Sequence, residues 1–459
     1  MRIAWVSPLP PESSGIADYS AELLPHLAPL AEIELFVADG RVPDPARTAG
    51  LPVEPLRHLA ARAERFDAIV YQLGNSGDHH AEIYRTLLEV PGVVVLHEVM
   101  LHHLIRAVTL VRGDAAGYTE EMRYAYGRSG AATARRFLAS GLPFDTWSHP
   151  LFERAVDASR AVIVHSEHAR GRILRSRPEA RVGLVPLAFD PASVGEEGSA
   201  SRTAARAELG LPEGAFVVAS FGFVTPAKRL PVSLKAFARL RRAVPDAIYL
   251  IAGEISPHYD FASVLERGLD AGVRATGRID LDAFHRAMHA ADVAINLRFP
   301  TGGETSASLV RLLGLGIPTL VSRTGWFAEI PEGCCLPVDL DEMEEDVIAA
   351  YLLRLAEDPE LRRRIGGNAR RYVAAHHSLP VAARGYVDFL AEVAAARLAP
   401  YRAVPPLAPW PPDDIATELA GEVANALADL GVSEGDEDLL RSAAEVLVDL
   451  GLESGPRGA

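Results

Sequence analysis

The residues best suited to bind a phosphorylated ligand are two neighbouring cations, Lys228 and Arg229. They lie in a polar turn after an apolar run that ends at Gly222. A lysine supplies a compact charge and an arginine holds phosphate oxygens in a planar fork, so the pair suits a diphosphate. Lys235 is the only other lysine in the sequence, which draws attention to the ammonium of Lys228. The alternative is an exposed pair of cations without a ligand.

A second loop with the composition of an anion site follows the strand predicted at residues 292–297. Two glycines precede Glu304 and two hydroxyl residues at the start of a predicted helix, where free N–H groups and the helix dipole favour phosphate. The carboxylate of Glu304 is able to accept hydrogen bonds from sugar hydroxyls. Helix capping by Thr305 or Ser306 is the alternative, but capping requires neither glycines nor arginines. The candidate residues are Arg298, Gly302, Gly303, Glu304, Thr305, Ser306 and Arg311.

The turn after the first predicted strand holds a single glycine, Gly15, which follows two serines and opens a helix at Ile16. It lacks the GxGxxG pattern of dinucleotide-binding turns. A helix N-terminus still offers free N–H groups, and Gly15 lets a ligand approach closely, so contact with a diphosphate is one interpretation. An ordinary strand-to-helix turn is the other.

His97 ends the fourth predicted strand, and Glu98, His102 and His103 follow it. Zinc-binding HExxH motifs need histidines four positions apart, whereas His97 and His102 are five apart, so this run does not predict a metal site. Ligands of open α/β sheets collect at the carboxyl ends of strands. We therefore expect His97 to position a sugar or its acceptor, and His102 and His103 to pack or face solvent.

These loops are positioned by short apolar strands that alternate with helices. The strands are apolar almost throughout, which indicates parallel sheets covered by helices on both faces. Two groups of strands predict two doubly wound, Rossmann-like α/β domains that face each other across a cleft. A single barrel is the alternative, and the break in the middle of the chain counts against it. The predicted strands are 2–7, 33–38, 67–72, 93–97, 161–165, 182–186, 216–222, 247–252, 273–276, 292–297, 318–322 and 335–338.

The domain organisation follows from changes in composition along the chain. The predicted segments are a first domain at 1–190, a linker at 189–206, a second domain at 205–380, an amphipathic helix at 380–398, a proline-rich spacer at 400–412 and a helical hairpin tail at 413–459. The tail contains two acidic amphipathic helix patterns, and each ends at a glycine. We expect it to dock on the body of the protein; a separate protein partner is the alternative.

Composition restricts the class of protein. The chain has 459 residues and a formal net charge of −15, which disfavours nucleic-acid partners and anionic membranes. Its two cysteines, Cys334 and Cys335, are adjacent and would form a disulfide only with strain. The N-terminus lacks a signal-peptide core, and no apolar run approaches the roughly 18 residues of a membrane span. We therefore expect a reduced, cytoplasmic protein without stable membrane insertion.

Together these motifs resemble the group 1 retaining glycosyltransferases of the GT-B fold, over about residues 1–395. The resemblance implies a metal-independent enzyme without a cofactor, which transfers a hexosyl-type sugar from a nucleotide sugar to a hydroxyl acceptor with retention of configuration. The donor would bind mainly to the second domain and the acceptor to the first, and the helix at 380–398 would pack back on the first domain. The blocks that carry the resemblance are 13–19, His97 with 101–103, Gly222 with Lys228, 303–306, 315–318 and 321–329.

Two positions depart from the family pattern. Members commonly carry two glutamates eight positions apart, one near the donor sugar and one on the ribose. Here Arg311 occupies the second position, and the first falls at Gly303 with Glu304 beside it. An arginine has no acceptor for ribose hydroxyls. Phe223 stands where an arginine often follows Gly222.

The mechanism that these residues predict is electrostatic. Lys228, Arg229 and the N–H groups near Gly15 and Thr305 would stabilise the charge that grows on the departing diphosphate, while His97 positions a sugar. Two other functions stay open: a sugar-nucleotide epimerase or phosphorylase, and a catalytically weakened glycosyltransferase-like binding protein. The predicted catalytic residues are His97, Lys228, Arg229 and Glu304, and the predicted donor-binding residues are Gly15, Gly222, Arg298, Gly303, Thr305, Ser306 and Arg311.

Overall fold

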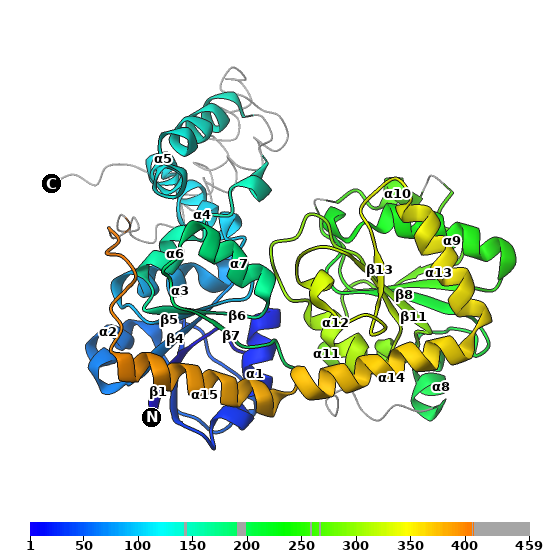
Figure 1. Cartoon of the computed structure of the whole chain (residues 1–459), viewed down its shortest axis with the longest axis horizontal. Helices are drawn as coiled ribbons and strands as arrows, with labels where there is room; N and C mark the ends of the chain where they lie inside the picture. Colours follow the sequence, from blue (N-terminus) through cyan, green and yellow to red (C-terminus); the bar gives the residue numbers. More distant parts are fainter. Residues whose placement is uncertain (142–144, 191–198, 258, 266–267, 406, 408–459) are drawn as a thin grey trace, which may run out of the picture.

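Two α/β units lie side by side in the computed structural model of the chain (Figure 1). The described residues are 1–141, 145–190, 199–257, 259–265, 268–405 and 407. Each unit has its own parallel sheet, so the prediction of two doubly wound domains is confirmed and a single barrel is excluded. The predicted tail at 413–459 lies outside the described residues.

The first sheet has seven parallel strands in the order β3-β2-β1-β4-β5-β6-β7. At its centre Ile3 pairs with Ile33 on one side and with Ala68 on the other. The six strands predicted in this half are present; β3 was missed because it has only three residues and ends at a proline. The strands are β1 (Arg2–Val6), β2 (Glu32–Val37), β3 (Val53–Pro55), β4 (Ala68–Leu73), β5 (Val93–Leu96), β6 (Ala161–Val164) and β7 (Val182–Leu184).

The second sheet has six parallel strands in the order β10-β9-β8-β11-β12-β13. All six predicted strands of this half are present. The strand order reverses between β1 and β4 in the first sheet and between β8 and β11 in the second. Ligands of open parallel sheets bind at such topological switch points. The strands are β8 (Val217–Phe221), β9 (Ile248–Ala252), β10 (Val273–Ala275), β11 (Val293–Asn296), β12 (Thr319–Ser322) and β13 (Leu336–Val338).

Helices connect the strands and cover the sheets (Figure 1). Ser14, Ser166 and Ser306 begin three of them by accepting a hydrogen bond from a first-turn N–H. No helix within the described ranges is long and apolar enough to cross a bilayer. The α-helices are α1 (Gly15–Leu27), α2 (Leu59–Arg62), α3 (Gly77–Glu89), α4 (His102–Val108), α5 (Ala115–Ser140), α6 (Glu153–Ala158), α7 (Glu167–Ser176), α8 (Ser199–Glu208), α9 (Leu230–Ala243), α10 (Ala262–Leu265), α11 (Leu281–Met288), α12 (Ala307–Gly314), α13 (Glu344–Glu357), α14 (Pro359–His376) and α15 (Leu379–Ala396).

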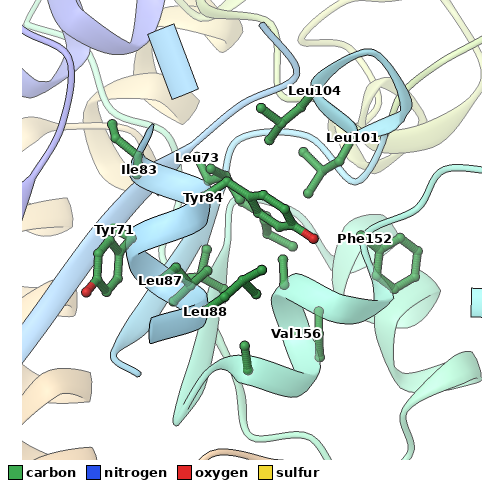
Figure 2. Packing of buried hydrophobic residues seen from close by; sticks show 14 of the residues in the cluster. Tyr71, Leu73, Ile83, Tyr84, Leu87, Leu88, Leu101, Leu104, Phe152 and Val156 are labelled. Carbon is green, nitrogen blue, oxygen red and sulfur yellow. The ribbon is translucent and has the colours of Figure 1, made fainter. Parts of the chain in front are cut away.

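Apolar side chains bury both faces of the first sheet. On one face, Tyr84 and Leu87 of α3 pack in the same cluster as Tyr71 of β4 and Val156 of α6 (Figure 2). On the other face, α1 and α15 contribute a second cluster around Trp5 of β1. Each fully buried aliphatic or aromatic side chain stabilises the fold by about 1.5–3 kcal/mol. The two layers hold the strand ends, and therefore the loops between them, in fixed positions.

The chain crosses between the domains twice, and the two crossings lie side by side. After β7, the N–H of Phe189 donates to the carbonyl of His377 (2.8 Å), and His377 Nδ1 donates to the carbonyl of Leu187 (2.7 Å). Helix α14 packs on α12 of the second domain, whereas α15 packs on α1 of the first. The helix predicted at 380–398 corresponds to α15.

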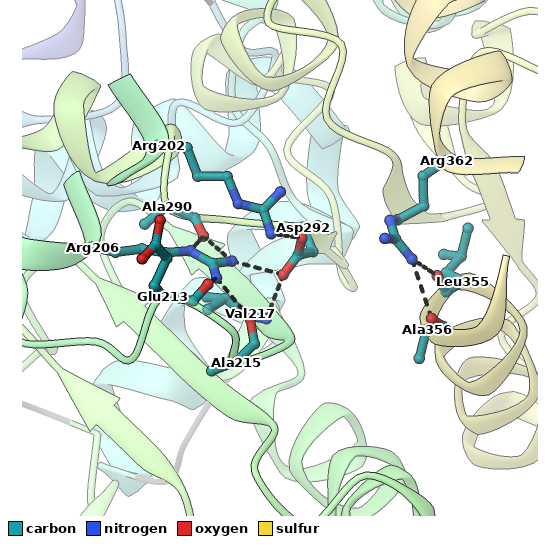
Figure 3. A network of polar contacts seen from close by, with 10 residues as sticks. All are labelled: Arg202, Arg206, Glu213, Ala215, Val217, Ala290, Asp292, Leu355, Ala356 and Arg362. Atoms are coloured by element: carbon teal, nitrogen blue, oxygen red, sulfur yellow. Dashed lines mark hydrogen bonds and ion pairs between the residues drawn. The ribbon is translucent and has the colours of Figure 1, made fainter. Parts of the chain in front are cut away.

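The linker between the domains is shorter than the sequence suggests. The sequence predicts a linker over 189–206, but α8 already belongs to the second domain (Figure 1). The guanidinium of Arg206 is buried, where it donates to the carbonyl of Ala290 and pairs with Asp292 at 2.8 Å (Figure 3). Asp292 also accepts a hydrogen bond from the N–H of Val217 at 2.8 Å. This network fixes α8 to the starts of β8 and β11. The sequence of α8 has the polar composition of a linker, but the charged side chain of Arg206 is buried inside the domain.

Candidate active site

A cavity of about 830 Å³ lies between the two domains, at the carboxyl ends of strands from both sheets. The first domain contributes Gly15 and Asp18 of α1, just after β1. The second domain contributes Gly222 after β8, Gly253 after β9 and Arg278 after β10. Parallel α/β sheets bind their ligands at this edge, so the cavity is the candidate substrate site.

Gly15 opens the first-domain wall of the cavity. A side chain built on this residue would meet no atom within 4 Å. Ser14 accepts a hydrogen bond from the N–H of Ile16 (3.3 Å) and caps α1. The positive end of a 13-residue helix therefore borders open space, as a diphosphate contact requires. Arg278 reaches from the second domain to donate to the hydroxyl of Ser13, so the two walls are in contact here.

Gly222 and Gly253 bring two backbone segments of the second-domain wall together. Their φ angles are +93° and +144°, a region that side chains with a Cβ rarely adopt. A Cβ on Gly253 would lie 2.5 Å from the carbonyl oxygen of Gly222, and a Cβ on Gly222 would lie 3.1 Å from Lys228 Nζ. Both positions therefore need glycine, and the predicted pair of Gly222 and Lys228 is in contact.

Lys228 is buried, with 7% of its surface exposed, and its ammonium donates to the carbonyl oxygen of Phe221 at the end of β8. Among the described residues, no carboxylate forms an ion pair with it. Burial, followed by the nearby charge of Arg298, holds the pKa of Lys228 far below its ordinary value, and Glu304 acts in the opposite direction. An anionic ligand at this position would supply the missing countercharge.

Arg229 has a different environment from its neighbour. It adopts a left-handed conformation (φ 54°) at the start of α9, and its Nε lies 2.8 Å from Oε1 of Glu344 on α13. The guanidinium also lies 5.9 Å from the ring centroid of Phe299. Glu344 therefore takes the donors that a phosphate would need, and Arg229 holds α9 to α13. Its predicted contact with a diphosphate stays a prediction.

The loop that carries Glu304 lies against the first domain. Arg298 pairs with Glu304 (3.0 Å), and the hydroxyl of Thr301 donates to the same carboxylate at 2.9 Å. The N–H groups of Val99 and Met100, in the loop after β5, donate to the carbonyl of Gly302 at 2.8 and 3.2 Å. Glu304 is thus oriented by its own loop, which is joined to the other domain.

Glu98 lies close to Glu304, although the sequence did not single it out as a candidate. A Cβ on Gly302 would lie 3.2 Å from Glu98 Oε2 and 3.3 Å from Glu304 Oε2, so the two carboxylates flank one glycine. Burial, and then the charge of Glu304, raises the pKa of Glu98 to about 8. The position of Glu98 directly after His97 was the one feature of the sequence that could have drawn attention to it. The sequence does not show that Glu304 of the other domain lies nearby.

Two predicted donor contacts are occupied by the protein itself. The hydroxyl of Ser306 accepts from the N–H of Leu309 (3.3 Å) and caps α12, which is the capping alternative. Thr305 is buried and its hydroxyl lies 3.5 Å from the carbonyl oxygen of His165 in the first domain. Gly303 has a φ of +79°, and a Cβ there would lie 2.6 Å from Val99. Close packing between the domains thus accounts for this glycine in the structure.

His97 contacts other polar side chains of the first domain and is not among the described residues that line the cavity. His97 Nε2 donates to Oε1 of Gln72 at 2.7 Å, and His165 Nδ1 donates to the carbonyl of Val185 at 2.8 Å. The other ring nitrogens, His97 Nδ1 and His165 Nε2, lie 3.3 Å apart. The ring of Tyr19 packs edge-on against His97 (5.4 Å between centroids). Burial, followed by the neighbouring His165, holds the pKa of His97 far below its usual value, so the ring is neutral.

Arg311 forms a contact across the domain boundary. Its guanidinium pairs with Glu22 of α1 (2.7 Å), and both side chains are about one-tenth exposed. The same guanidinium lies 5.0 Å from the ring centroid of Phe189. The residue at the position of the family's ribose glutamate therefore joins α12 to α1.

The described residues contain no group of three or more His, Cys, Asp or Glu side chains able to hold a metal ion. His102, from the run that resembles a zinc motif, is buried; its Nδ1 donates to the carbonyl of His149 (2.6 Å) and its Nε2 lies 3.0 Å from the hydroxyl of Tyr118. Packing, one of its two predicted roles, accounts for this histidine. The thiols of Cys334 and Cys335 are free.

Comparison with known proteins gives a family match over the second domain and a fold match over most of the chain. The family model "Glycosyl transferases group 1" matches residues 201–372. HepE of Anabaena, in complex with UDP and glucose, has a similar structure (TM-score 0.59, 16% identity, 85% of this chain and 100% of HepE covered). Sucrose-phosphate synthase of Thermosynechococcus elongatus is also similar, with a TM-score of 0.59 and 17% identity over 86% of this chain and 100% of the synthase. WaaG, a glycosyltransferase involved in lipopolysaccharide biosynthesis, has a TM-score of 0.57 and 14% identity over 84% of this chain and 99% of WaaG. No curated protein matches the chain significantly.

The two sheets and the cavity between them define a GT-B protein, the class in which two Rossmann-like domains enclose a substrate. Residues 201–372, which make up most of the second domain, match the model of the group 1 glycosyltransferases. The predicted GT-B fold is confirmed, and the family match supports the predicted resemblance over the second domain.

Proposed function

We propose that this protein is a group 1 glycosyltransferase. It would move a hexosyl unit, with retention of configuration and without a metal ion, from a nucleotide sugar in the interdomain cavity to a hydroxyl acceptor. The observation that supports it best is the buried ammonium of Lys228 beside Gly222, in a protein of net charge −15. Keeping a cation buried without a carboxylate destabilises the fold, and an anionic ligand would compensate for that cost.

Electrostatic stabilisation of the leaving group is the proposed basis of catalysis. As the bond from the anomeric carbon to the diphosphate breaks, negative charge grows on the diphosphate oxygens. Lys228 would stabilise it from the second domain and the N-terminus of α1 at Gly15 from the first. A diphosphate oxygen is itself able to accept the proton of the acceptor hydroxyl, so no protein general base is required. His97 and Glu304 would orient sugar hydroxyls.

We assign ribose recognition to Asp18 in place of residue 311. The carboxylates that line the cavity are Glu12, Asp18, Glu254 and Asp280. Glu12 contacts His79, Glu254 lies near Arg278, and Asp280 caps α11. Asp18 has one ion pair, with Arg47 at the 4.0 Å limit, and one-third of its side chain is exposed. A carboxylate of this kind is able to accept both hydroxyls of a ribose.

Nucleotide binding is the first test, measured as thermal unfolding of the full chain with UDP, GDP, ADP and their sugar conjugates after chelation of metals. UDP-glucose is the first donor to try, because HepE is seen with UDP-glucose. A ligand at a hundredfold excess over its Kd raises stability by about 2.7 kcal/mol. Transfer is then measured with the ligand that binds, and the anomeric configuration of the product by NMR.

Each outcome separates the candidate functions. Transfer with retention supports the proposal, and an inverted product contradicts its stereochemistry. Release of a changed sugar without an acceptor would indicate an epimerase or phosphorylase. Binding without transfer or hydrolysis would favour the glycosyltransferase-like binding protein, for which the Arg311 to Glu22 contact is the supporting observation. Absence of binding to every nucleotide would contradict the proposed donor site.

A further inference from the structure

Helix α5 projects from the first domain on the side away from α1 and α15 (Figure 1). It is kinked at Gly127, whose φ and ψ are 64° and −147°. Before the kink its inner side is tied to α6: Glu121 pairs with Arg154 at 2.8 Å, and the hydroxyl of Tyr124 donates to Asp157 at 2.7 Å. The helix is therefore rigidly attached, although much of its second half faces solvent.

The exposed side of the second half carries three arginines, Arg128, Arg135 and Arg136, together with Leu138, which is 39% exposed. We call these four residues the arginine face. Positions 128 and 135 are two turns apart and so lie on one side of the helix. Among the described residues none of the three guanidinium groups has an ion pair, whereas Arg123, which precedes the kink, pairs with Glu120 at 2.6 Å.

The last described residues of the chain lie against α6, which holds the first half of α5. After α15, the N–H groups of Tyr401 and Arg402 donate to the carbonyls of Ser159 and Asp157 at 2.9 and 2.7 Å. The carbonyl of Pro405 then accepts from Arg154, the residue of α6 that pairs with Glu121 of α5. The described part of the predicted proline-rich spacer thus lies against α6, the helix to which α5 is tied.

Those residues have the complementary charge. The segment 413–459 contains twelve acidic side chains and two arginines. It therefore holds most of the excess negative charge of a protein whose net charge is −15. Its two helix patterns also carry leucines and valines at helical spacing, so that an apolar stripe would accompany the acids.

We propose that segment 413–459 docks in cis on the arginine face of α5. A single exposed ion pair contributes at most about 1 kcal/mol, so docking requires several pairs together with apolar contact at Leu138. The short tether through residues 400–407 makes the encounter intramolecular, which raises the effective concentration of the tail at α5. The inference does not depend on the proposed glycosyl transfer.

The test is hydrogen–deuterium exchange of the full chain, with Arg128→Glu, Arg135→Glu and Arg136→Glu combined in one variant. We expect tail peptides to exchange at least several-fold faster in this variant than in the wild type at low salt, and the wild type to approach the variant at about 0.5 M salt. A matched control, Arg242→Glu with Arg364→Glu, reverses two exposed arginines of the second domain and should leave tail exchange unchanged.

Restoration by charge exchange completes the test. Adding Asp436→Arg, Glu437→Arg and Asp438→Arg to the reversed variant should return slow exchange to the tail. Equal tail exchange in the wild type and the reversed variant would overturn the proposal. If the arginine face then binds anionic vesicles, its partner is a membrane instead of the tail. If the protection of the tail from exchange disappears on dilution, and analytical ultracentrifugation shows dimers, docking in cis is overturned. The tail would then dock on a second copy of the chain.

Discussion

Two buried cations of the second domain differ in what neutralises them. Lys228, at the end of β8, is 7% exposed and contacts a backbone carbonyl; Arg311, on α12, is 8% exposed and pairs with Glu22 of the other domain. Burial alone therefore does not mark a binding residue. A buried cation with a carboxylate partner joins parts of the fold, whereas one without a partner is available to an anionic ligand.

The largest effect is expected from breaking the paired cation. Arg311→Met leaves the carboxylate of Glu22 buried and unpaired, and should lower the stability by about 3–5 kcal/mol. Thermal or urea unfolding would measure it. Adding Glu22→Gln should recover much of the loss, because the second change removes the orphaned charge. A fully stable Arg311→Met protein would show that this contact does not hold the domains together.

Removing the unpaired cation should affect turnover but not the fold. Lys228→Met should reduce kcat/KM by about 100- to 1000-fold, the usual cost of one group that stabilises an oxyanion. Its melting temperature should equal or exceed that of the wild type, since burial of the ammonium is unfavourable. Unchanged turnover, or a large loss of stability, would remove the distinction between Lys228 and Arg311.

The pH dependence of stability sharpens the same point. The pKa of Lys228 is lowered in the folded protein, so between that value and 10.5 the unfolded chain binds more protons. Stability should therefore rise with pH across this window in the wild type, and this rise should be absent from Lys228→Met. Unfolding measured at several pH values between 7 and 10 would compare the two; parallel curves would contradict a lowered pKa.

A smaller effect is expected on ribose recognition. Asp18→Asn should weaken binding of the preferred nucleoside diphosphate by about 10- to 100-fold, the range for one or two charge-assisted hydrogen bonds. The matched comparison is the 2′,3′-dideoxy nucleotide, which should bind equally to both proteins. Calorimetry measures each affinity. An equal loss for both nucleotides would show that Asp18 acts on the fold or on the diphosphate.

The smallest effect concerns Glu98. Its pKa of about 8 is above the ordinary value of 4.5, so it contributes stability that is complete below pH 4.5 and is lost as the pH rises through 8. Glu98→Gln has no proton to lose, and should gain about 1 kcal/mol relative to the wild type between pH 7 and pH 8. A constant difference between the two proteins would contradict the raised pKa.

The sequence predicted the parts of the fold that depend on local pattern. Apolar strands, the serine that begins α1, and the glycines at strand ends are all local signals, and they located both sheets and the cavity. Pairings between distant residues were not predictable, since one sequence carries no record of contacts. Arg229 and Glu344 are 115 positions apart, and Arg311 and Glu22 are 289 apart. The family pattern showed that residue 311 was unusual, but only the structure shows its partner.

The near absence of lysine gives this protein a chemical reporter of cavity occupancy. Lys235 is exposed on α9, whereas Lys228 is buried beside the cavity. An amine-reactive label should modify Lys235 and the N-terminus quickly and Lys228 slowly, and mass spectrometry would resolve these few products without background from other lysines. Labelling of Lys228 should speed up when the domains separate and stop when a nucleotide sugar is bound, with Lys235 as the internal standard in the same molecule.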